Sequence, residues 1–138
     1  MTLYLDTSTI LRALFGQVPV LAGWGNWNAA YSSDVMGVEA RRAIDRLRLA
    51  GALDDAGVAD AHAEPARIER SLGRVRLTRR VLVRAAQPMA TAVRTLDAVH
   101  LASALLLRER HGDDLLFATH DRRQAISARA LGFTCVGV

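Results

Sequence analysis

The stretch that decides the fold of this chain is Leu3-Tyr4-Leu5-Asp6, a short apolar run that ends in an acid. A second apolar run, residues 115–119, is followed two positions later by Asp121. Short apolar runs of this kind are typical of buried strands in a parallel sheet. The carboxyl ends of parallel strands lie along one edge, where α/β folds place their ligand crevice. We therefore expect Asp6 and Asp121 to meet at that edge.

Two further acids, Glu39 and Asp97, lie near the starts of predicted helices. Glu39 falls at the margin of the apolar face of its helix, so it can reach a crevice. Asp97 opens a helix that is apolar on most faces, and a buried acid needs a partner or a metal. Two charges about 5 Å apart repel by roughly 3 kcal/mol at an effective dielectric near 20. A cluster of four acids is thus expected to need a divalent cation.

Each acid also has an ordinary structural explanation. Glu39 could pair with Arg42 one turn along the helix or with Arg46 further along it. Asp97 is favoured by the helix dipole, and Asp121 and Asp6 could each cap the helix that follows them. The joint placement of the four acids, rather than any one of them, carries the functional argument.

Strands that alternate with helices along the chain predict an α/β fold with parallel pairing. We expect a kink or break at Pro65 and an interruption near Pro88. The expected strands are residues 2–6, 30–33, 75–77, 115–119 and 133–136, and the expected helices are residues 8–15, 18–28, 34–50, 54–72, 79–93, 95–110 and 122–131.

The length of 138 residues predicts a single domain, residues 1–138, which buries roughly 68% of its unfolded surface. No apolar run approaches the roughly 18 residues of a membrane span, and Asp6 and Arg12 interrupt any signal peptide. The lone Cys135 has no partner for a disulfide and no second thiol for a zinc site. These features predict a cytoplasmic protein with no membrane contact.

The net charge is +4, and all 18 basic residues are arginines. Guanidinium groups match phosphate oxygens in a two-pronged geometry, which favours a polyanion such as nucleic acid. A coding bias toward GC-rich codons explains the arginines equally well. The absence of lysine is more informative, because it excludes a Walker phosphate loop and a lysine Schiff base.

Four blocks of sequence together resemble a PIN domain of the VapC toxin type. The match covers nearly the whole chain in the right order. It implies a PIN-like three-layer fold, with a central, mostly parallel sheet of four or five strands flanked by helices. The matching blocks are Leu3–Ser8, Tyr31–Ala43 with its Val38-Glu39-Ala40 core, Leu96–Ala104 and Ala118–Phe133.

The resemblance implies an endoribonuclease that depends on Mg²⁺ or Mn²⁺ and acts as the toxin of a type II toxin–antitoxin pair. It cleaves RNA with a metal-activated water and leaves 5′-phosphate and 3′-hydroxyl ends. Its partners are a cognate antitoxin, the RNA substrate and a second copy in a homodimer. By position, Asp6 and Asp97 are the principal metal ligands, and Glu39 and Asp121 complete the catalytic pocket directly or through water.

The resemblance also implies roles for residues beside the acids. Thr119 matches a hydroxyl residue beside the fourth acid, and Thr7 is expected to orient Asp6. Both threonines also have capping explanations. Flanking phosphates are expected to contact exposed arginines, namely Arg79, Arg80, Arg122 and Arg123.

Three histidines and two tryptophans have no assigned role. His100, one turn after Asp97, could support that acid or be an ordinary helix histidine, and His62 and His120 are also left open. Trp24 and Trp27 depart from the family pattern. They could fill core space beneath a short helix or anchor a protein partner.

Two other classes of function compete. In a phosphatase or phospho-acceptor, Asp6 would be the phosphorylated group. One such family needs a second Asp where this chain has Ser8, and the other needs a lysine, which this chain lacks. A non-catalytic protein- or RNA-binding module that retains the PIN fold is the stronger alternative. The variant Asp97→Asn separates the toxin from the binding module, because a toxin would lose growth inhibition while a binding module would keep its phenotype.

Overall fold

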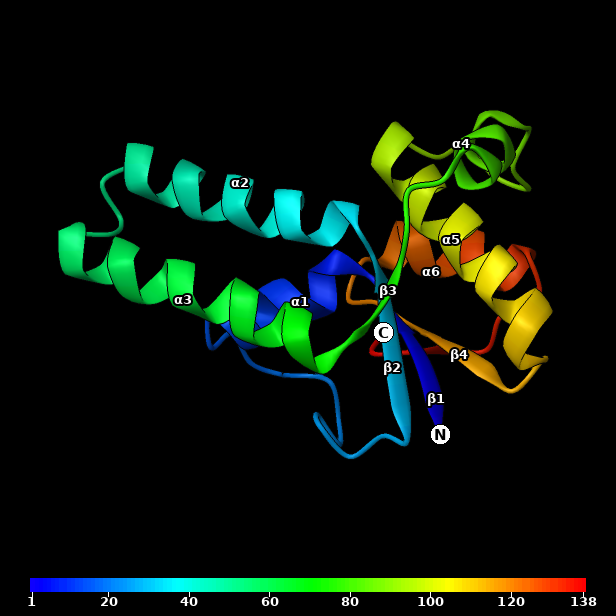
Figure 1. Ribbon diagram of the computed structural model, residues 1–138, viewed down its shortest axis with the longest axis horizontal. Coiled ribbons are helices and arrows are strands. Elements are labelled where there is room, and N and C mark those ends of the chain that lie inside the picture. The colour runs from blue at the N-terminus through cyan, green and yellow to red at the C-terminus, as the bar shows by residue number, and fades with distance from the viewer.

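The computed structural model describes residues 1–138 and contains five parallel strands in the order β3-β2-β1-β4-β5. Six helices flank the sheet (Figure 1). This confirms the predicted α/β fold and its parallel pairing. The strands are β1 (Thr2–Leu5), β2 (Ala29–Ser33), β3 (Gly73–Val75), β4 (Leu115–Ala118) and β5 (Cys135–Val136), and the helices are α1 (Thr7–Leu14), α2 (Val35–Leu49), α3 (Asp55–Ser71), α4 (Arg79–Ala86), α5 (Thr95–His111) and α6 (Arg122–Ala130).

Central strand β1 divides the core into two layers. Because successive side chains of a strand point to opposite faces, Leu3 and Leu5 lie on one face and Tyr4 on the other. The two leucines pack with buried residues of α1, α2 and α3, including Ile10. Tyr4 packs with α5 and α6 residues and stacks on Phe117 of β4 at 5.3 Å between ring centroids. The sheet is therefore covered on both faces.

Helices α2 and α3 form a hairpin that projects beyond the sheet (Figure 1). The Arg41 guanidinium of α2 donates two hydrogen bonds of 2.9 Å to the Glu69 carboxylate of α3. Arg41 also donates to the Gly37 carbonyl, so the fork ties α3 to the backbone of α2. This anchoring holds the start of α2, where Glu39 lies, beside the sheet edge.

The predicted helix over residues 18–28 is wrong. The chain forms turns there, closed by hydrogen bonds from the Trp24 amide to Leu21 and from the Asn26 amide to Gly23. Gly23 has a φ of 73°, which is incompatible with a right-handed helix. Trp24 and Trp27 are half-buried, meet edge to face at 5.2 Å and pack against the core on the α1 side. Their packing matches the core-filling interpretation.

Smaller differences lie at element boundaries. Helix α4 ends at Ala86 rather than residue 93, because the residue before Pro88 is disfavoured in helical conformation. Helix α3 runs through Pro65 without a break. Strand β3 begins at Gly73, two residues before the predicted start, where Gly73 pairs with Tyr31 of β2. None of the helices is both long enough and apolar enough to cross a lipid bilayer.

Candidate functional site

The four acids come from four separate elements at one end of the sheet. Asp6 follows β1, Glu39 lies in the first turns of α2, Asp97 lies in the first turn of α5, and Asp121 is the N-cap of α6. Each is linked to another acid through a shared protein partner, as described below. The edge predicted from the strand ends is therefore where the acids lie.

Asp6 is the most buried of the four, with 7% of its side chain exposed. Its Oδ2 accepts hydrogen bonds from Ser8 Oγ at 2.7 Å and from Thr119 Oγ1 at 2.9 Å. Thr119 Oγ1 in turn accepts from the backbone amide of Asp121 at 3.0 Å. One hydroxyl thus fixes Asp6 and links it to the start of α6.

Glu39 is held by the buried His100 of α5. His100 Nε2 lies 2.7 Å from Glu39 Oε1, and Thr7 Oγ1 donates to the same oxygen at 2.8 Å. His100 Nε2 is also 3.8 Å from Asp6 Oδ1. On the other side of the ring, Nδ1 lies 2.8 Å from the Tyr4 hydroxyl. The imidazole therefore connects two of the acids to the core.

The charges in this network shift the pKa of both partners. Burial opposes a charged His100, but the hydrogen bond to Glu39 and the charges of Asp6, Glu39 and Asp97 outweigh it, so the pKa of His100 is raised. Burial also opposes an ionised Glu39, yet the contacts with His100 and Thr7 leave the pKa of Glu39 lowered. Burial raises the pKa of Tyr4 well above its ordinary value, so this phenol stays protonated. The pair His100 and Glu39 is thus favoured in its ionised form.

Asp97 and Asp121 share a second cation, Arg94. Arg94 Nε donates to Asp97 Oδ2 at 3.0 Å, and Arg94 Nη2 lies 3.7 Å from Asp121 Oδ2. Asp121 also caps α6, since its Oδ1 accepts from the amides of Arg123 at 2.8 Å and Gln124 at 3.3 Å. The capping explanation of Asp121 is confirmed, and it leaves Oδ2 facing Arg94.

Each of the four carboxylates keeps one oxygen that accepts no hydrogen bond. The two buried side-chain polar atoms without a partner are His120 Nε2 and Gln124 Oε1, so the free carboxylate oxygens reach solvent. The free atoms are Asp6 Oδ1, Glu39 Oε2, Asp97 Oδ1 and Asp121 Oδ2.

Such hard oxygen donors are the ligand type that Mg²⁺ and Mn²⁺ prefer. As the side chains lie, no group of three or more His, Cys, Asp or Glu residues is arranged to hold a metal ion. The acids are instead divided between two protein groups: His100 lies beside Asp6 and Glu39, and Arg94 lies beside Asp97 and Asp121. The oxygen donors of the four acids suit a divalent ion. In the present arrangement, His100 and Arg94 contact the carboxylates that would bind such an ion.

Some sequence predictions need correction. Thr7 does not orient Asp6, because its hydroxyl contacts Glu39 and His100. Glu39 forms no ion pair with Arg42, which binds Asp45 further along α2, and the charge of Arg46 makes only a small contribution to lowering the pKa of Glu39. Thr119 does contact Asp6 as well as the start of α6.

Three residues of the network were not given a role from sequence. Ser8 holds Asp6 and also accepts from the His120 amide at 2.9 Å. Arg94 and His100 lie three residues before and after Asp97, with Arg94 at the N-cap of α5 and His100 one turn along the helix from Asp97. That spacing is the signal that could have identified them.

The predicted phosphate contacts differ in availability. Arg80 is paired with Glu109 at 2.6 Å, so part of its charge is already neutralised. Arg79, Arg122 and Arg123 are exposed and their side chains form no ion pair.

The chain was compared with known families and structures. The model of the PIN domain family matches residues 3–129. The fold is similar to a chain of the solved structure of FitAB bound to the IR36 DNA fragment, with a TM-score of 0.64 and 16% sequence identity. That alignment covers 96% of this chain and 92% of the FitAB chain. A search of curated proteins gave no match.

Proposed function

The chain belongs to the PIN domain family, and from this premise we propose that it is a metal-dependent endoribonuclease of the VapC type, the toxin of a type II toxin–antitoxin pair. The observation that carries the proposal is the convergence of Asp6, Glu39, Asp97 and Asp121 on one network at the carboxyl end of the sheet. Each acid there presents one oxygen to solvent.

Asp6 and Asp97 would hold Mg²⁺ or Mn²⁺, with Glu39 and Asp121 completing the pocket directly or through water. A divalent ion in such a pocket polarises the scissile phosphate and lowers the pKa of bound water. The four carboxylates supply the negative charge that attracts the ion, and the cap position of Asp121 limits the movement of its side chain.

The chain's own residues prepare the acids for this role. Ser8 and Thr119 fix one oxygen of Asp6 and leave Oδ1 free. His100 holds Glu39 in its ionised form and fixes Oε1, which leaves Oε2 free to face the pocket. His100 is buried and would act by positioning Glu39.

The RNA would be held mainly through its phosphates. Arg122 and Arg123 begin α6 directly after Asp121, and Arg79 begins α4. Their exposed guanidinium groups suit phosphate oxygens, while few aromatic residues are available for stacking on bases. Recognition would thus depend on the shape of the RNA backbone more than on stacking.

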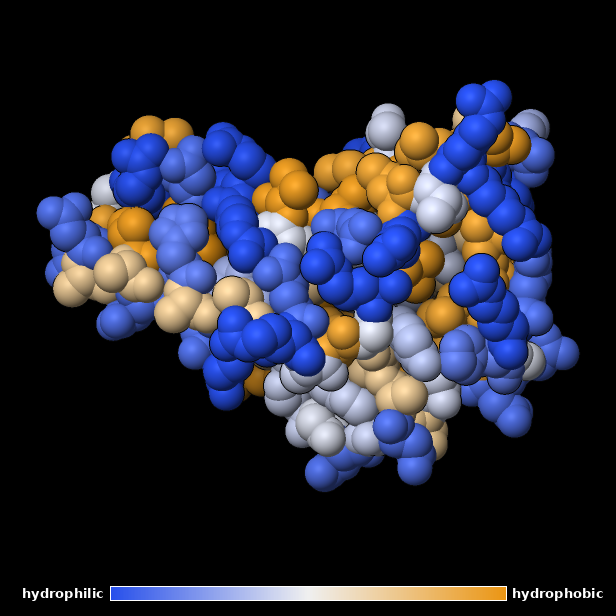
Figure 2. All heavy atoms as spheres, viewed as in Figure 1, coloured by the Kyte–Doolittle hydropathy of each residue, from blue (hydrophilic) through white to orange (hydrophobic).

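Exposed apolar side chains next to the acids support a protein partner. Val38 and Leu96 precede Glu39 and Asp97 directly and are 63% and 45% exposed. Figure 2 shows hydrophobic atoms gathered over the start of α2 and the α4–α5 region. We propose that the antitoxin or a second protomer covers this surface, because exposed apolar patches of this kind mark interaction sites. The chain is similar to part of FitAB, which is itself bound to DNA in its structure.

The decisive experiment incubates purified, antitoxin-free protein with structured RNA, first with Mg²⁺ or Mn²⁺ and then with a chelator. Cleavage should require the metal and should disappear in Asp97→Asn, which should keep its fold by circular dichroism. In cells, the same variant should lose growth inhibition while still binding the antitoxin. Cleavage that persists in chelator, or no cleavage under any condition, would reject the nuclease.

One observation favours the alternative, a non-catalytic protein- or RNA-binding module with the PIN fold. Each acid already has a partner within the chain, and no three ligands surround a common point. If that alternative holds, Asp97→Asn will bind the same RNA or protein as the unmodified chain and neither will cleave RNA.

A further inference from the structure

Arg94 is the one arginine that contacts two of the four acids. Its Nε donates to Asp97 Oδ2 at 3.0 Å, and its Nη2 lies 3.7 Å from Asp121 Oδ2. The contact with Asp97, followed by the charges of Asp121 and Asp6, raises the pKa of Arg94. The guanidinium thus lies in the field of three of the acids.

The position of Arg94 in the chain permits this contact and its release. Arg94 is the N-cap residue of α5, has extended backbone angles, and follows a segment without regular structure after α4. Its side chain is 74% exposed, whereas that of Asp97 is 23% exposed. A surface ion pair with so exposed a partner is weak, because solvent screens it. The guanidinium is therefore tethered close to the acids but loosely held.

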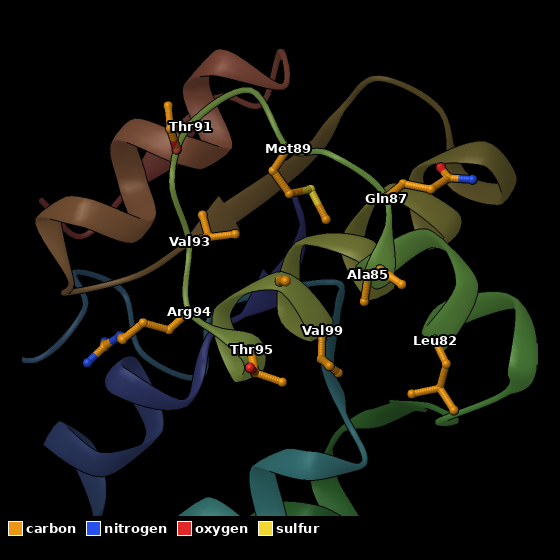
Figure 3. Close-up of a pocket in the computed structure, with 11 residues that line it drawn as sticks. Leu82, Ala85, Gln87, Met89, Thr91, Val93, Arg94, Thr95 and Val99 are labelled. Atoms are coloured by element: carbon orange, nitrogen blue, oxygen red, sulfur yellow. The ribbon is translucent and has the colours of Figure 1, made fainter.

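Two cavities meet at this residue. Figure 3 shows the first, a cavity of about 510 Å³ lined mostly by apolar side chains, with the Arg94 side chain directed away from Leu82 and Met89. The second, of about 270 Å³, is polar and is lined by Arg94 together with Asp97 and Arg123. Arg94 therefore turns from the apolar cavity toward the carboxylates, and solvent reaches Asp97 beside it.

We propose that the Arg94 guanidinium is a built-in counter-cation of the acidic site, which a divalent ion must displace from Asp97 in order to bind. This inference rests on the proposed function, because it takes the four acids to be the metal site. Without a metal, Arg94 offsets the repulsion among Asp97, Asp121 and Asp6. A metal that approaches Asp97 meets a positive charge on the same carboxylate, so the residue at position 94 sets the metal affinity.

The first test measures Mn²⁺ binding in the absence of RNA, by isothermal titration calorimetry and by the electron paramagnetic resonance signal of free Mn²⁺. Arg94→Gln removes the competing charge and should bind Mn²⁺ more tightly than the unmodified chain, by up to about fivefold for a screened surface ion pair. Arg94→Lys keeps the positive charge but lacks the planar guanidinium, so it should change the Mn²⁺ affinity less than Arg94→Gln does. Arg110→Gln is the matched control, since it removes one positive charge at the other end of α5 and should leave the affinity unchanged.

The second test follows the arginine itself. In a ¹H–¹⁵N spectrum of arginine side chains, the Arg94 Nε–H signal is identified by its absence in Arg94→Lys. Titration with Mg²⁺, which is diamagnetic, should shift this signal with the same midpoint as metal binding. The Arg110 signal should not move.

The possible outcomes separate the two proposals. If the unmodified chain binds Mn²⁺ and Arg94→Gln binds it equally or more weakly, the counter-cation role is overturned and the nuclease proposal stands. A static Arg94 signal during Mg²⁺ binding overturns the role in the same way. If neither the unmodified chain nor Arg94→Gln binds Mn²⁺, the metal site itself is rejected, and both proposals end. Thermal unfolding of each variant confirms that a folded protein was measured.

Discussion

His100 is the residue at which the acidic site and the hydrophobic core meet. Its side chain is 1% exposed, with Glu39 on one ring nitrogen and the Tyr4 hydroxyl on the other. Tyr4 belongs to the central strand and also stacks on Phe117. A catalytic carboxylate would thus be positioned through a buried histidine of α5 that is itself hydrogen-bonded to the central strand. Changes in the core should therefore be transmitted to the site.

Tyr4→Phe tests this link between core and site. The variant keeps the aromatic packing but leaves buried His100 Nδ1 without its partner, which typically costs about 1–3 kcal/mol. We expect a free energy of unfolding lower by that amount in urea titrations. Tyr31→Phe is the control, because the Tyr31 hydroxyl makes no hydrogen bond, and it should change stability by less than about 0.5 kcal/mol. Equal effects of the two variants would mean that the Tyr4 hydroxyl does not support His100.

At the scale of elements, one forked ion pair adds to the apolar packing between the two helices of the α2–α3 hairpin. Arg41 and Glu69 have 41% and 19% of their side chains exposed, so solvent screens the pair only in part. The hydrogen bond with Arg41 lowers the pKa of Glu69 below its ordinary value of 4.5. A lowered pKa in the folded state means that the ionised carboxylate stabilises the fold above the unfolded pKa. That stability is lost as the pH falls through the folded pKa.

Glu69→Gln should therefore be less stable than the unmodified chain by up to about 1 kcal/mol at pH 7. The difference should shrink as the pH falls below about 4.5 and vanish once Glu69 is protonated. Denaturant titrations from pH 3 to 7 measure it. Glu64→Gln breaks an exposed pair with Arg67 in the same helix and should show almost no difference at any pH. If the difference in free energy of unfolding between Glu69→Gln and the unmodified chain stays constant down to pH 3, the charge of Glu69 does not stabilise the fold.

The edge strand β3 gives a second element-scale prediction. Gly73 pairs with Tyr31, and a β-carbon at position 73 would overlap the Tyr31 ring. Gly73→Ala should lower the free energy of unfolding by about 1–3 kcal/mol, because the ring must move. In a Tyr31→Ala background the same change should cost much less, which a double-mutant cycle measures. Additive effects would show that the ring is not the obstacle.

Elements with a clear local signal were predictable, and those without one were not. The run Leu3 to Leu5 and the apolar helix after Thr95 are specified by their own residues. The segment around Trp24 has apolar residues at helical spacing, but the glycines at 23 and 25 adopt left-handed angles that only the folded chain reveals. Glycines signal turns, and here that signal outweighed the spacing.

The acids of the site were placed by topology, since strand ends converge in any parallel sheet. The hydrogen-bond partners of these acids could not be predicted from topology. Whether Glu39 contacts Arg42 or His100 depends on how α2 packs against α5. No local sequence pattern predicts the packing of two helices that are far apart in the chain. Whether the acids are catalytic stays a prediction that the nuclease assay tests.

At the scale of the whole molecule, positive charge is placed unevenly relative to the acidic end of the sheet. The arginines of α6 follow Asp121 directly, whereas Arg80 on α4 is bound to Glu109 near the opposite end of α5 from Asp97. A net charge of +4 implies that RNA affinity falls as salt rises. The dependence on salt therefore reports which arginines neutralise phosphates.

We expect Arg122→Gln and Arg123→Gln each to reduce the slope of log K against log salt concentration by about 0.7, the value for one phosphate contact on a single strand. Arg80→Gln should reduce it less, because Glu109 already neutralises part of that charge. Fluorescence anisotropy with labelled RNA in an Asp97→Asn background measures binding without cleavage, and Arg67→Gln on α3 is the control. An equal loss of slope at Arg80 would mean that RNA opens the Arg80–Glu109 pair and that Arg80 contacts a phosphate directly.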